Sequence, residues 1–164
     1  MHGSIKEPLR PTLGLIALLA AGLLQAGDTT VLTGVGYGPF RRLPGTGYAS
    51  LEFDHILGKS SFGGWISADI ARDGQFVGLG PMVQARITPS WSAAISTGPG
   101  WYSDQPGLNL GSKIEFRSTA YLLFKANDRY GLGLAASHYS NGGIARHNPG
   151  AETLRLLLII PFRP

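Results

Sequence analysis

Residues 112–125 read SKIEFRSTAYLLFK, and this stretch decides the fold class because its side chains alternate in polarity. One set of alternate positions holds Lys113, Glu115, Arg117, Thr119 and Tyr121, and the other holds Ile114, Phe116, Ala120, Leu122 and Phe124. Successive side chains of a β-strand point to opposite faces of the sheet. The pattern therefore predicts a strand with one polar and one apolar face.

Seven further segments show the same period of two, at residues 29–39, 47–57, 62–73, 75–88, 90–103, 129–140 and 152–163. Clusters of Gly, Pro, Asn, Asp or Ser separate most of them, as turns require. Strands of about ten residues that carry one apolar face are typical of membrane barrels. The sequence thus predicts an all-β protein, an eight-stranded antiparallel transmembrane β-barrel of the outer membrane.

The composition excludes several other classes. Only 15% of the 164 residues are charged, 24 are Gly and none is Cys, which argues against a disordered polar chain, a disulfide scaffold and a thiolate metal site. The net charge of +4 is spread along the chain, with no basic run interleaved with aromatics. Nucleic acid is therefore not an expected partner.

A secreted soluble barrel of the lipocalin type is the main alternative fold, because it has the same strand count but turns its apolar face inward. In residues 62–73 the alternate sets are Trp65, Ser67 and Asp69 against Ile66, Ala68 and Ile70. Across the segments the polar sets carry both signs of charge, so they can pair inside a narrow lumen. We therefore expect the polar faces to line the lumen and the apolar faces to meet lipid.

The N-terminal residues predict export. Lys6 and Arg10 precede an uncharged apolar run from Leu13 to Leu24, and the small residue Ala26 follows shortly after it. This layout is that of a secretory signal peptide, and the run is shorter than the ~20 residues that a membrane helix needs. We expect residues 1–26 to be the signal peptide and residues 27–164 to form the barrel.

The last two segments carry candidate catalytic residues on one face. The row that contains Leu132, Leu134 and Ala136 continues to His138 and Ser140, and the next segment begins its aliphatic row with Glu152. A carboxylate that orients an imidazole, beside a serine, is an acyl-transfer arrangement. Each residue alone is commonly a solvated strand end, so a non-enzymatic structural or adhesive barrel is the alternative. Ionisable groups on a lipid-facing row are costly, which favours a function.

A motif surrounds these residues. His138 to Ile144 read HYSNGGI, Asn148-Pro149-Gly150 and Glu152 follow, and the segment ends in Ile160-Pro161-Phe162. The motif closely resembles the C-terminal hairpin of the lipid A 3-O-deacylase (PagL) family. That family consists of eight-stranded outer-membrane barrels that hydrolyse the ester at the 3 position of lipid A with a Ser-His-Glu triad.

The resemblance implies a role for each motif residue. His138 would be the base, Ser140 the nucleophile and Glu152 the residue that orients the imidazole. Asn148 would donate to the oxyanion, the backbone of Gly143 would be a second donor, and Asn141 belongs to the motif. The implied activity is that of a serine esterase that releases a 3-hydroxy fatty acid from lipopolysaccharide, without a metal or other cofactor.

The resemblance also implies where the substrate lies. With an even number of strands and both termini in the periplasm, the connection from Asn141 to Ala151 would be extracellular, so the site would face the outer leaflet. Lipid A would arrive sideways through the surrounding outer-membrane lipid. Its acyl chain would lie along Leu132, Leu134, Ala136, Leu154 and Leu156, in a shallow groove. Family members are reported to dimerise, so a homodimer is allowed.

Overall fold

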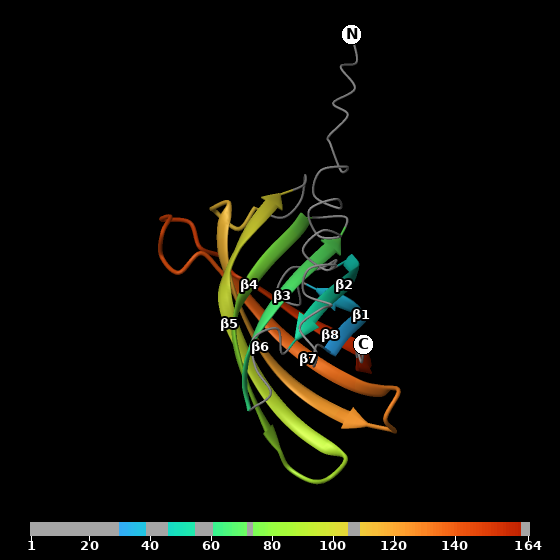
Figure 1. The fold of residues 1–164 in the computed structure, drawn as a ribbon. Coiled ribbons are helices and arrows are strands. Elements are labelled where there is room, and N and C mark those ends of the chain that lie inside the picture. Colours follow the sequence, from blue (N-terminus) through green and yellow to red (C-terminus); the bar gives the residue numbers. More distant parts are fainter. Residues whose placement is uncertain (1–29, 39–45, 55–60, 72–73, 105–108, 162–164) are drawn as a thin grey trace.

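The computed structural model describes residues 30–38, 46–54, 61–71, 74–104 and 109–161. These residues form eight strands, which begin and end within three residues of the predicted segments. The strands are β1 (Thr30–Gly38), β2 (Thr46–Asp54), β3 (Phe62–Ala71), β4 (Gly74–Arg86), β5 (Trp91–Asp104), β6 (Ile114–Lys125), β7 (Gly131–Ser140) and β8 (Ala151–Pro161) (Figure 1). The predicted signal peptide, residues 1–26, lies outside the described residues.

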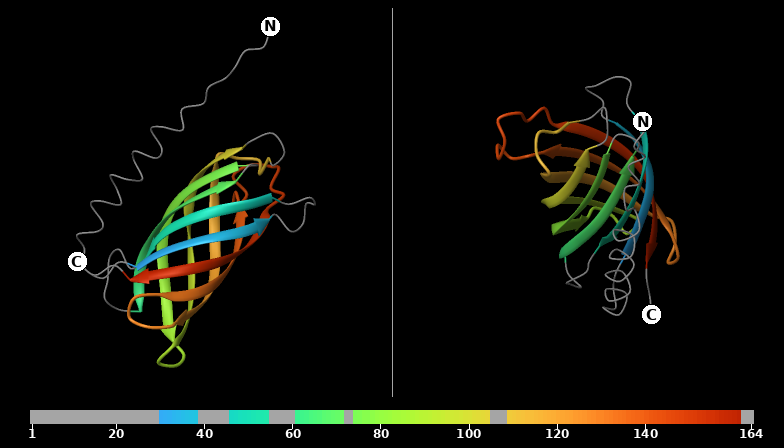
Figure 2. Two further views of the ribbon diagram at one scale, coloured as in Figure 1. Left: turned by 90° about the vertical axis from the view of Figure 1, so that its right-hand side faces the viewer. Right: turned by 90° about the horizontal axis from the view of Figure 1, so that it is seen from above.

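The strands close into a barrel. Each pairs antiparallel with its neighbours in sequence, and β8 pairs with β1 through a register that runs from Thr30↔Pro161 to Tyr37↔Leu154. The strands are tilted across the barrel wall (Figure 2). Closure gives every strand a partner on both sides, so no sheet edge is left open. The predicted eight-stranded antiparallel barrel is therefore confirmed.

The outer face of the wall is aliphatic. Along β7 the side chains alternate between buried and exposed, and Leu132 and Leu134 lie on the exposed row. Other large exposed apolar side chains of the strands are Val35, Leu79, Val83, Ile95, Leu122, Leu154, Leu156, Leu158 and Ile160. A soluble barrel would bury these rows in its interior. Here they face outward, which is the arrangement of a barrel that sits in lipid.

Charged side chains fill the middle of the lumen. Arg117, on β6, is fully buried, and its Nη2 donates to Glu52 Oε2 at 2.6 Å while its Nη1 donates to Asp69 Oδ2 at 3.1 Å. The guanidinium also lies over the ring of Trp65, 4.1 Å from the centroid. One arginine thus joins β2, β3 and β6 across the lumen.

A second arginine completes the pairing. Arg155 Nη1, from β8, lies 3.5 Å from Glu52 Oε2 and 3.6 Å from Asp69 Oδ1. The phenol groups of Tyr121 and Tyr139 donate to Glu52 Oε1 and Asp69 Oδ2, each at 2.6 Å. Two cations therefore face two anions, and the prediction that polar faces of both signs pair inside a narrow lumen is confirmed.

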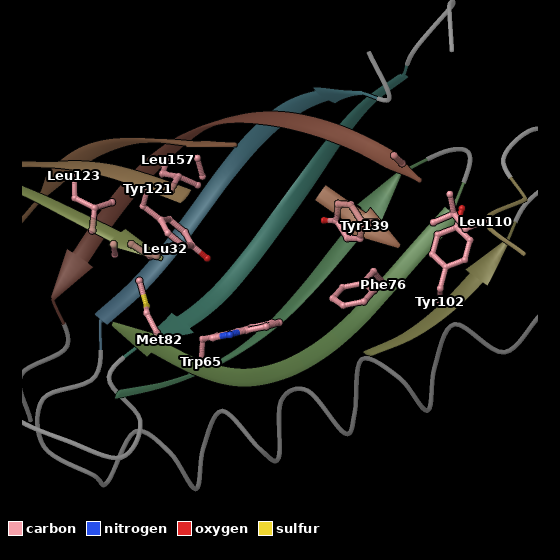
Figure 3. Close-up of a cluster of buried hydrophobic side chains, with 13 residues drawn as sticks. Leu32, Trp65, Phe76, Met82, Tyr102, Leu110, Tyr121, Leu123, Tyr139 and Leu157 are labelled. Atoms are coloured by element: carbon pink, nitrogen blue, oxygen red, sulfur yellow. The ribbon is translucent and has the colours of Figure 1, made fainter. Parts of the chain in front are cut away.

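Apolar side chains pack on both sides of this network. Leu32, Met82, Leu123 and Leu157 lie toward one end of the lumen, and Tyr102 and Leu110 lie toward the other (Figure 3). The lumen is thus a packed core rather than a channel over this length. The alternation did not distinguish these apolar inward positions, because it separates the two faces of a strand without saying how each face is filled.

The two ends of the barrel differ. The start of β1 and the end of β8 meet at one end, and the connection from β7 to β8 lies at the other, opposite the turn from β4 to β5 (Figure 1). The part of the chain that the structure describes contains no helix long and apolar enough to cross a membrane.

Candidate active site

His138 and Glu152 face each other across β7 and β8 on the outer wall. They are register partners, and His138 Nδ1 lies 3.2 Å from Glu152 Oε1. The His138 side chain is 51% exposed and that of Glu152 is 26% exposed. An imidazole that donates from Nδ1 carries its lone pair on Nε2. The pair can therefore hold His138 as a base whose acceptor nitrogen points away from the carboxylate.

Ser140 is the last residue of β7 and shares the outer row of His138. Two residues along a strand span about 7 Å between Cα atoms. Within the described residues the two side chains are not hydrogen-bonded to each other, and Ser140 Oγ accepts from the Gly142 N–H at 3.3 Å. Catalytic hydrogen bonds are often long before substrate binds. The structure thus brings the three predicted residues to one patch of the wall, without a hydrogen bond between Ser140 and His138.

A tight turn follows Ser140. Gly142 and Gly143 both have positive φ, +62° and +84°, and the Ile144 N–H donates to the Asn141 carbonyl at 3.1 Å. Positive φ at both central residues defines a type I′ turn, which favours Asn-Gly and Gly-Gly. The Asn-Gly-Gly run of the motif therefore reverses the chain directly beyond the serine.

Asn141 organises the loop. It is fully buried, and its Nδ2 donates to the carbonyls of Leu110 at 3.2 Å and His147 at 2.8 Å. Gly111 lies so close to His147 that an added Cβ would meet the His147 carbonyl. Asn141 thus ties the connection that precedes β6 to the connection between β7 and β8. The sequence analysis placed Asn141 in the motif among the candidate site residues, and these hydrogen bonds hold the loop that carries Gly143 and Asn148.

Candidate oxyanion donors lie in the same loop. Asn148 is exposed, and its Oδ1 accepts from the Asn141 N–H at 3.1 Å, so its amide nitrogen keeps its donors for another partner. The Gly143 N–H donates to Asn141 Oδ1 at 3.0 Å in this structure. Gly142, which the sequence analysis did not single out, directs its N–H at Ser140 Oγ. In the sequence, the signal for Gly142 was the Gly-Gly pair that follows Asn141.

Gly150 is a second residue that the sequence analysis did not single out. Its φ is +64°, and an added Cβ would lie 3.0 Å from His138 Cε1 and 3.7 Å from His138 Nε2. The absence of a side chain there lets the imidazole rest over the backbone of the loop. The Pro-Gly pair at 149–150 was the available signal, and it indicates a turn rather than a contact with His138.

The predicted groove residues form one outward patch beside the pair. Across β7 and β8, Ala136 pairs with Leu154 and Leu134 pairs with Leu156, and Leu132 follows on the same row. The four leucines are each about half exposed. The patch begins next to His138 and Glu152 and runs away from the loop. On its other side, β6 contributes Ala120 and Leu122 as partners of Ala136 and Leu134.

A cavity of about 690 Å³ lies at the opposite end of the barrel. It is lined by residues that include Leu32, Gln84, Arg86, Lys125 and Tyr130, so it does not adjoin His138. Among the residues that the structure describes, no three His, Cys, Asp or Glu side chains gather as a metal site would require.

The match to a protein-family model extends well beyond the C-terminal motif. The model of the family described as lipid A 3-O-deacylase (PagL) matches residues 47–161, which include all of β2 except Thr46, the strands β3 to β8 and all the candidate residues. No curated protein sequence matches the chain significantly.

Solved structures match the fold. A crystal structure of the outer membrane enzyme PagL matches with a TM-score of 0.61 and 20% identity, over 82% of this chain and 99% of that one. A designed transmembrane β-barrel matches with a TM-score of 0.58 and 13% identity, over 82% and 95% of the two chains. The Yersinia pestis outer membrane protein Ail matches with a TM-score of 0.56 and 15% identity, over 83% and 99%. Because such barrels share this shape at low identity, the fold alone does not define an activity.

Proposed function

This chain belongs to the lipid A 3-O-deacylase (PagL) family of outer-membrane barrels, and on that premise we propose that it is a serine esterase that hydrolyses the acyl ester at the 3 position of lipid A. The observation that carries the proposal is the contact between His138 Nδ1 and Glu152 Oε1, 3.2 Å apart, on the outer wall beside Ser140. A histidine and a carboxylate on a lipid-facing surface are energetically unfavourable, so their presence there favours a functional role.

The proposed reaction follows from these positions. Ser140 Oγ attacks the ester carbonyl carbon while its proton passes to His138 Nε2, and Glu152 stabilises the imidazolium through Nδ1. The sugar oxygen leaves with the proton from His138, and an acyl-serine remains. Water, activated by His138, then attacks the acyl-serine and releases the 3-hydroxy fatty acid.

The oxyanion of the tetrahedral intermediate needs donors near Ser140. The side-chain amide of Asn148 is one proposed donor, since its oxygen is already held by the Asn141 N–H. The Gly142 N–H, 3.3 Å from Ser140 Oγ, is the backbone donor best directed at the serine. The Gly143 N–H would first have to release Asn141 Oδ1. Fixed donors of this kind stabilise the charge that develops in the transition state.

The orientation of the barrel completes the proposal. With its terminal strand ends in the periplasm, the β7–β8 connection lies outside the cell, and the patch around His138 meets the outer leaflet. The acyl chain that is cleaved then lies against Leu132, Leu134, Ala136, Leu154 and Leu156, which face lipid. Residues 1–26 are the proposed export signal, to be removed before the barrel of residues 27–164 inserts.

Mass spectrometry of lipid A from cells with and without the protein tests the function. We expect the protein to cause loss of one 3-hydroxyacyl group from the 3 position, and Ser140→Ala to abolish that loss while the variant still folds as a heat-modifiable barrel. Unchanged lipid A with a folded, inserted wild-type barrel would support the non-enzymatic alternative. Loss of the acyl group by Ser140→Ala would exclude this serine mechanism.

A further inference from the structure

A polar row crosses four strands of the outer wall at the level of His138. Glu152 on β8 is the register partner of His138 on β7, His138 is the partner of Ser118 on β6, and Ser118 is the partner of Thr97 on β5. All four side chains lie on the outward rows. Thr97 Oγ1 and Ser118 Oγ are 3.0 Å apart and hydrogen-bonded. The polar patch therefore extends from the His–Glu pair across β6 to β5.

The rows on either side of Ser118 and Thr97 are apolar. Toward the loop end, the next outward residue on β5 is Pro99 and that on β6 is Phe116. Away from it, the corresponding residues are Ile95 and Ala120. Hydroxyl groups on a lipid-facing wall are unfavourable unless hydrogen-bonded. The two hydroxyls satisfy each other in part, and they are placed directly beside the reacting groups.

The pair keeps hydrogen-bonding capacity for a ligand. A hydroxyl has one donor and two acceptor sites, so when one donates to the other, the second still has its own proton to donate. The wall behind the pair is held from inside. Trp65 Nε1 donates to the Thr97 carbonyl at 3.3 Å, and Trp65 is itself buried beneath Arg117. Ser118 and Thr97 thus present a donor and acceptors from a fixed backbone.

The wall also has room for a chain next to this pair. Ala120 and Ala136 are register partners on β6 and β7, one row farther from the loop than Ser118 and His138. Ile95 and Leu154 flank them on β5 and β8, and both of these larger side chains are exposed. The side chains of Ala120 and Ala136 are shorter than those of Ile95 and Leu154, so an acyl chain laid over the alanines can come closer to the backbone of the wall.

We infer that Ser118, supported by Thr97, binds the 3-hydroxyl group of the acyl chain that is cleaved, and that the chain then runs over Ala120 and Ala136. The inference rests on the proposed function. The hydroxyl of a 3-hydroxyacyl ester is two carbons from the carbonyl carbon that Ser140 attacks. Ser118 is directly opposed to His138, whereas Ser140 is opposed to Phe116, so Ser118 and Ser140 are diagonal neighbours about 7–8 Å apart. The two carbons and the hydroxyl beyond the carbon bonded to Ser140 Oγ can span that distance. A substrate hydroxyl next to the reacting carbon is therefore within reach of Ser118.

The inference moves part of the acyl subsite from β7 and β8 onto β6. It also gives the enzyme a means to recognise the hydroxylated chain, because a site built to bond a hydroxyl discriminates against the analogue without it. Ser118 is thus a specificity-determining residue, distinct from the residues that carry out the reaction.

The test uses two lipid A analogues of equal chain length that differ only in the 3-hydroxyl of the acyl group at the 3 position. We expect purified wild-type protein in detergent to favour the hydroxylated analogue in kcat/KM by about tenfold, the value of one hydrogen bond. Ser118→Ala should lose that preference by slowing the hydroxylated substrate alone, and Ser118→Thr should retain it. Thr33→Val, which removes an outward hydroxyl near the other end of the wall, should leave both rates unchanged.

The outcomes separate the two proposals. Hydrolysis of both analogues at equal rates by the wild type, or a preference that survives in Ser118→Ala, overturns the role of Ser118 and leaves the esterase intact. Hydrolysis of neither analogue by a folded wild-type barrel overturns both proposals. If Ser118→Ala does not fold, Thr97→Val tests the same preference, because it keeps the shape of the wall and removes the supporting hydroxyl. A preference unchanged in that folded variant also overturns the inference.

Discussion

The barrel contains two polar clusters built around carboxylates, and they differ in burial, in partners and in balance of charge. In the lumen, Glu52 and Asp69 are buried, and two arginines and two tyrosines surround them. On the outer wall, Glu152 is partly exposed and contacts the more exposed His138. The first cluster is closed and its charges are opposed in equal number. The second has an imidazole nitrogen and a serine hydroxyl that face the surroundings.

The difference shows that a small barrel can hold the residues that stabilise it in the lumen and the residues proposed to react on the outer wall. In the lumen the charges of Arg117 and Arg155 are paired with those of Glu52 and Asp69, and the pairs join strands that are distant in sequence. On the wall, the His138 side chain is half exposed and Ser140 is partly exposed, so both can contact another molecule. We expect changes in the lumen to alter folding and changes on the wall to alter activity, and the following substitutions test that division.

Ser140→Ala should have the largest effect. We expect deacylation to fall by about 10³-fold or more, because the proposed reaction passes through an acyl intermediate on this hydroxyl. The urea midpoint for unfolding should stay unchanged, since the Ser140 hydroxyl accepts only one long hydrogen bond from Gly142. Release of 3-hydroxy fatty acid and unfolding in the same lipid vesicles give the two measurements. A lowered midpoint would contradict the prediction that substitutions on the wall alter activity without altering stability.

Arg117→Met should have the largest effect on stability. It leaves Glu52 and Asp69 without their closest cation, and breaking a buried pair in this way typically costs about 3–5 kcal/mol. We expect a large fall in the urea midpoint, measured by loss of the heat-modifiable form. Arg146→Met, in the exposed loop, is the matched control and should change the free energy of unfolding by less than about 0.5 kcal/mol. Equal stability of the two variants would contradict a structural role for the lumen network.

Glu152→Ala should have a smaller effect on activity than Ser140→Ala. If Glu152 orients His138 and stabilises its charge, we expect a loss in kcat/KM about 10- to 100-fold smaller than that of Ser140→Ala, which is the relation between the carboxylate and the serine of a protease triad. Stability should change little because the Glu152 side chain is partly solvated. His138→Ala is the comparison, and a Glu152→Ala loss as large as that of His138→Ala would indicate a direct part in proton transfer.

Gly150→Ala should have the smallest effect of the four. The added Cβ would lie 3.0 Å from His138 Cε1, and the positive φ at this position adds strain of about 1 kcal/mol. We expect a severalfold loss of activity with a small loss of stability. Gly47→Ala is the control, because its Cβ would meet nothing closer than the Gly36 carbonyl oxygen at 3.8 Å. Activity that stays at the wild-type level in Gly150→Ala would show that the imidazole can shift without cost.

The sequence predicts some residues of the candidate site and misses others. His138, Ser140 and Glu152 could be found from the sequence because they are polar residues on aliphatic rows inside a specific motif. The part played by Asn141 could not, since its partner Leu110 is distant in sequence. Ser118 also escaped notice. It is a polar residue on the apolar row of residues 114–124 but belongs to no motif, and only the pairing of β6 with β7 brings it beside His138.

The sequence by itself determined the number of strands, their order, which face of each meets lipid, and the family to which the hairpin belongs. These properties follow from local alternation, turn residues and a short motif. The tertiary structure alone decided the pairing of Arg117 with Glu52 and Asp69, the link between the loops through Asn141, and the polar row from Glu152 to Thr97. The physical reason is that register and lumen contacts join residues far apart in the chain, and a local pattern does not encode which strand positions will be opposite one another.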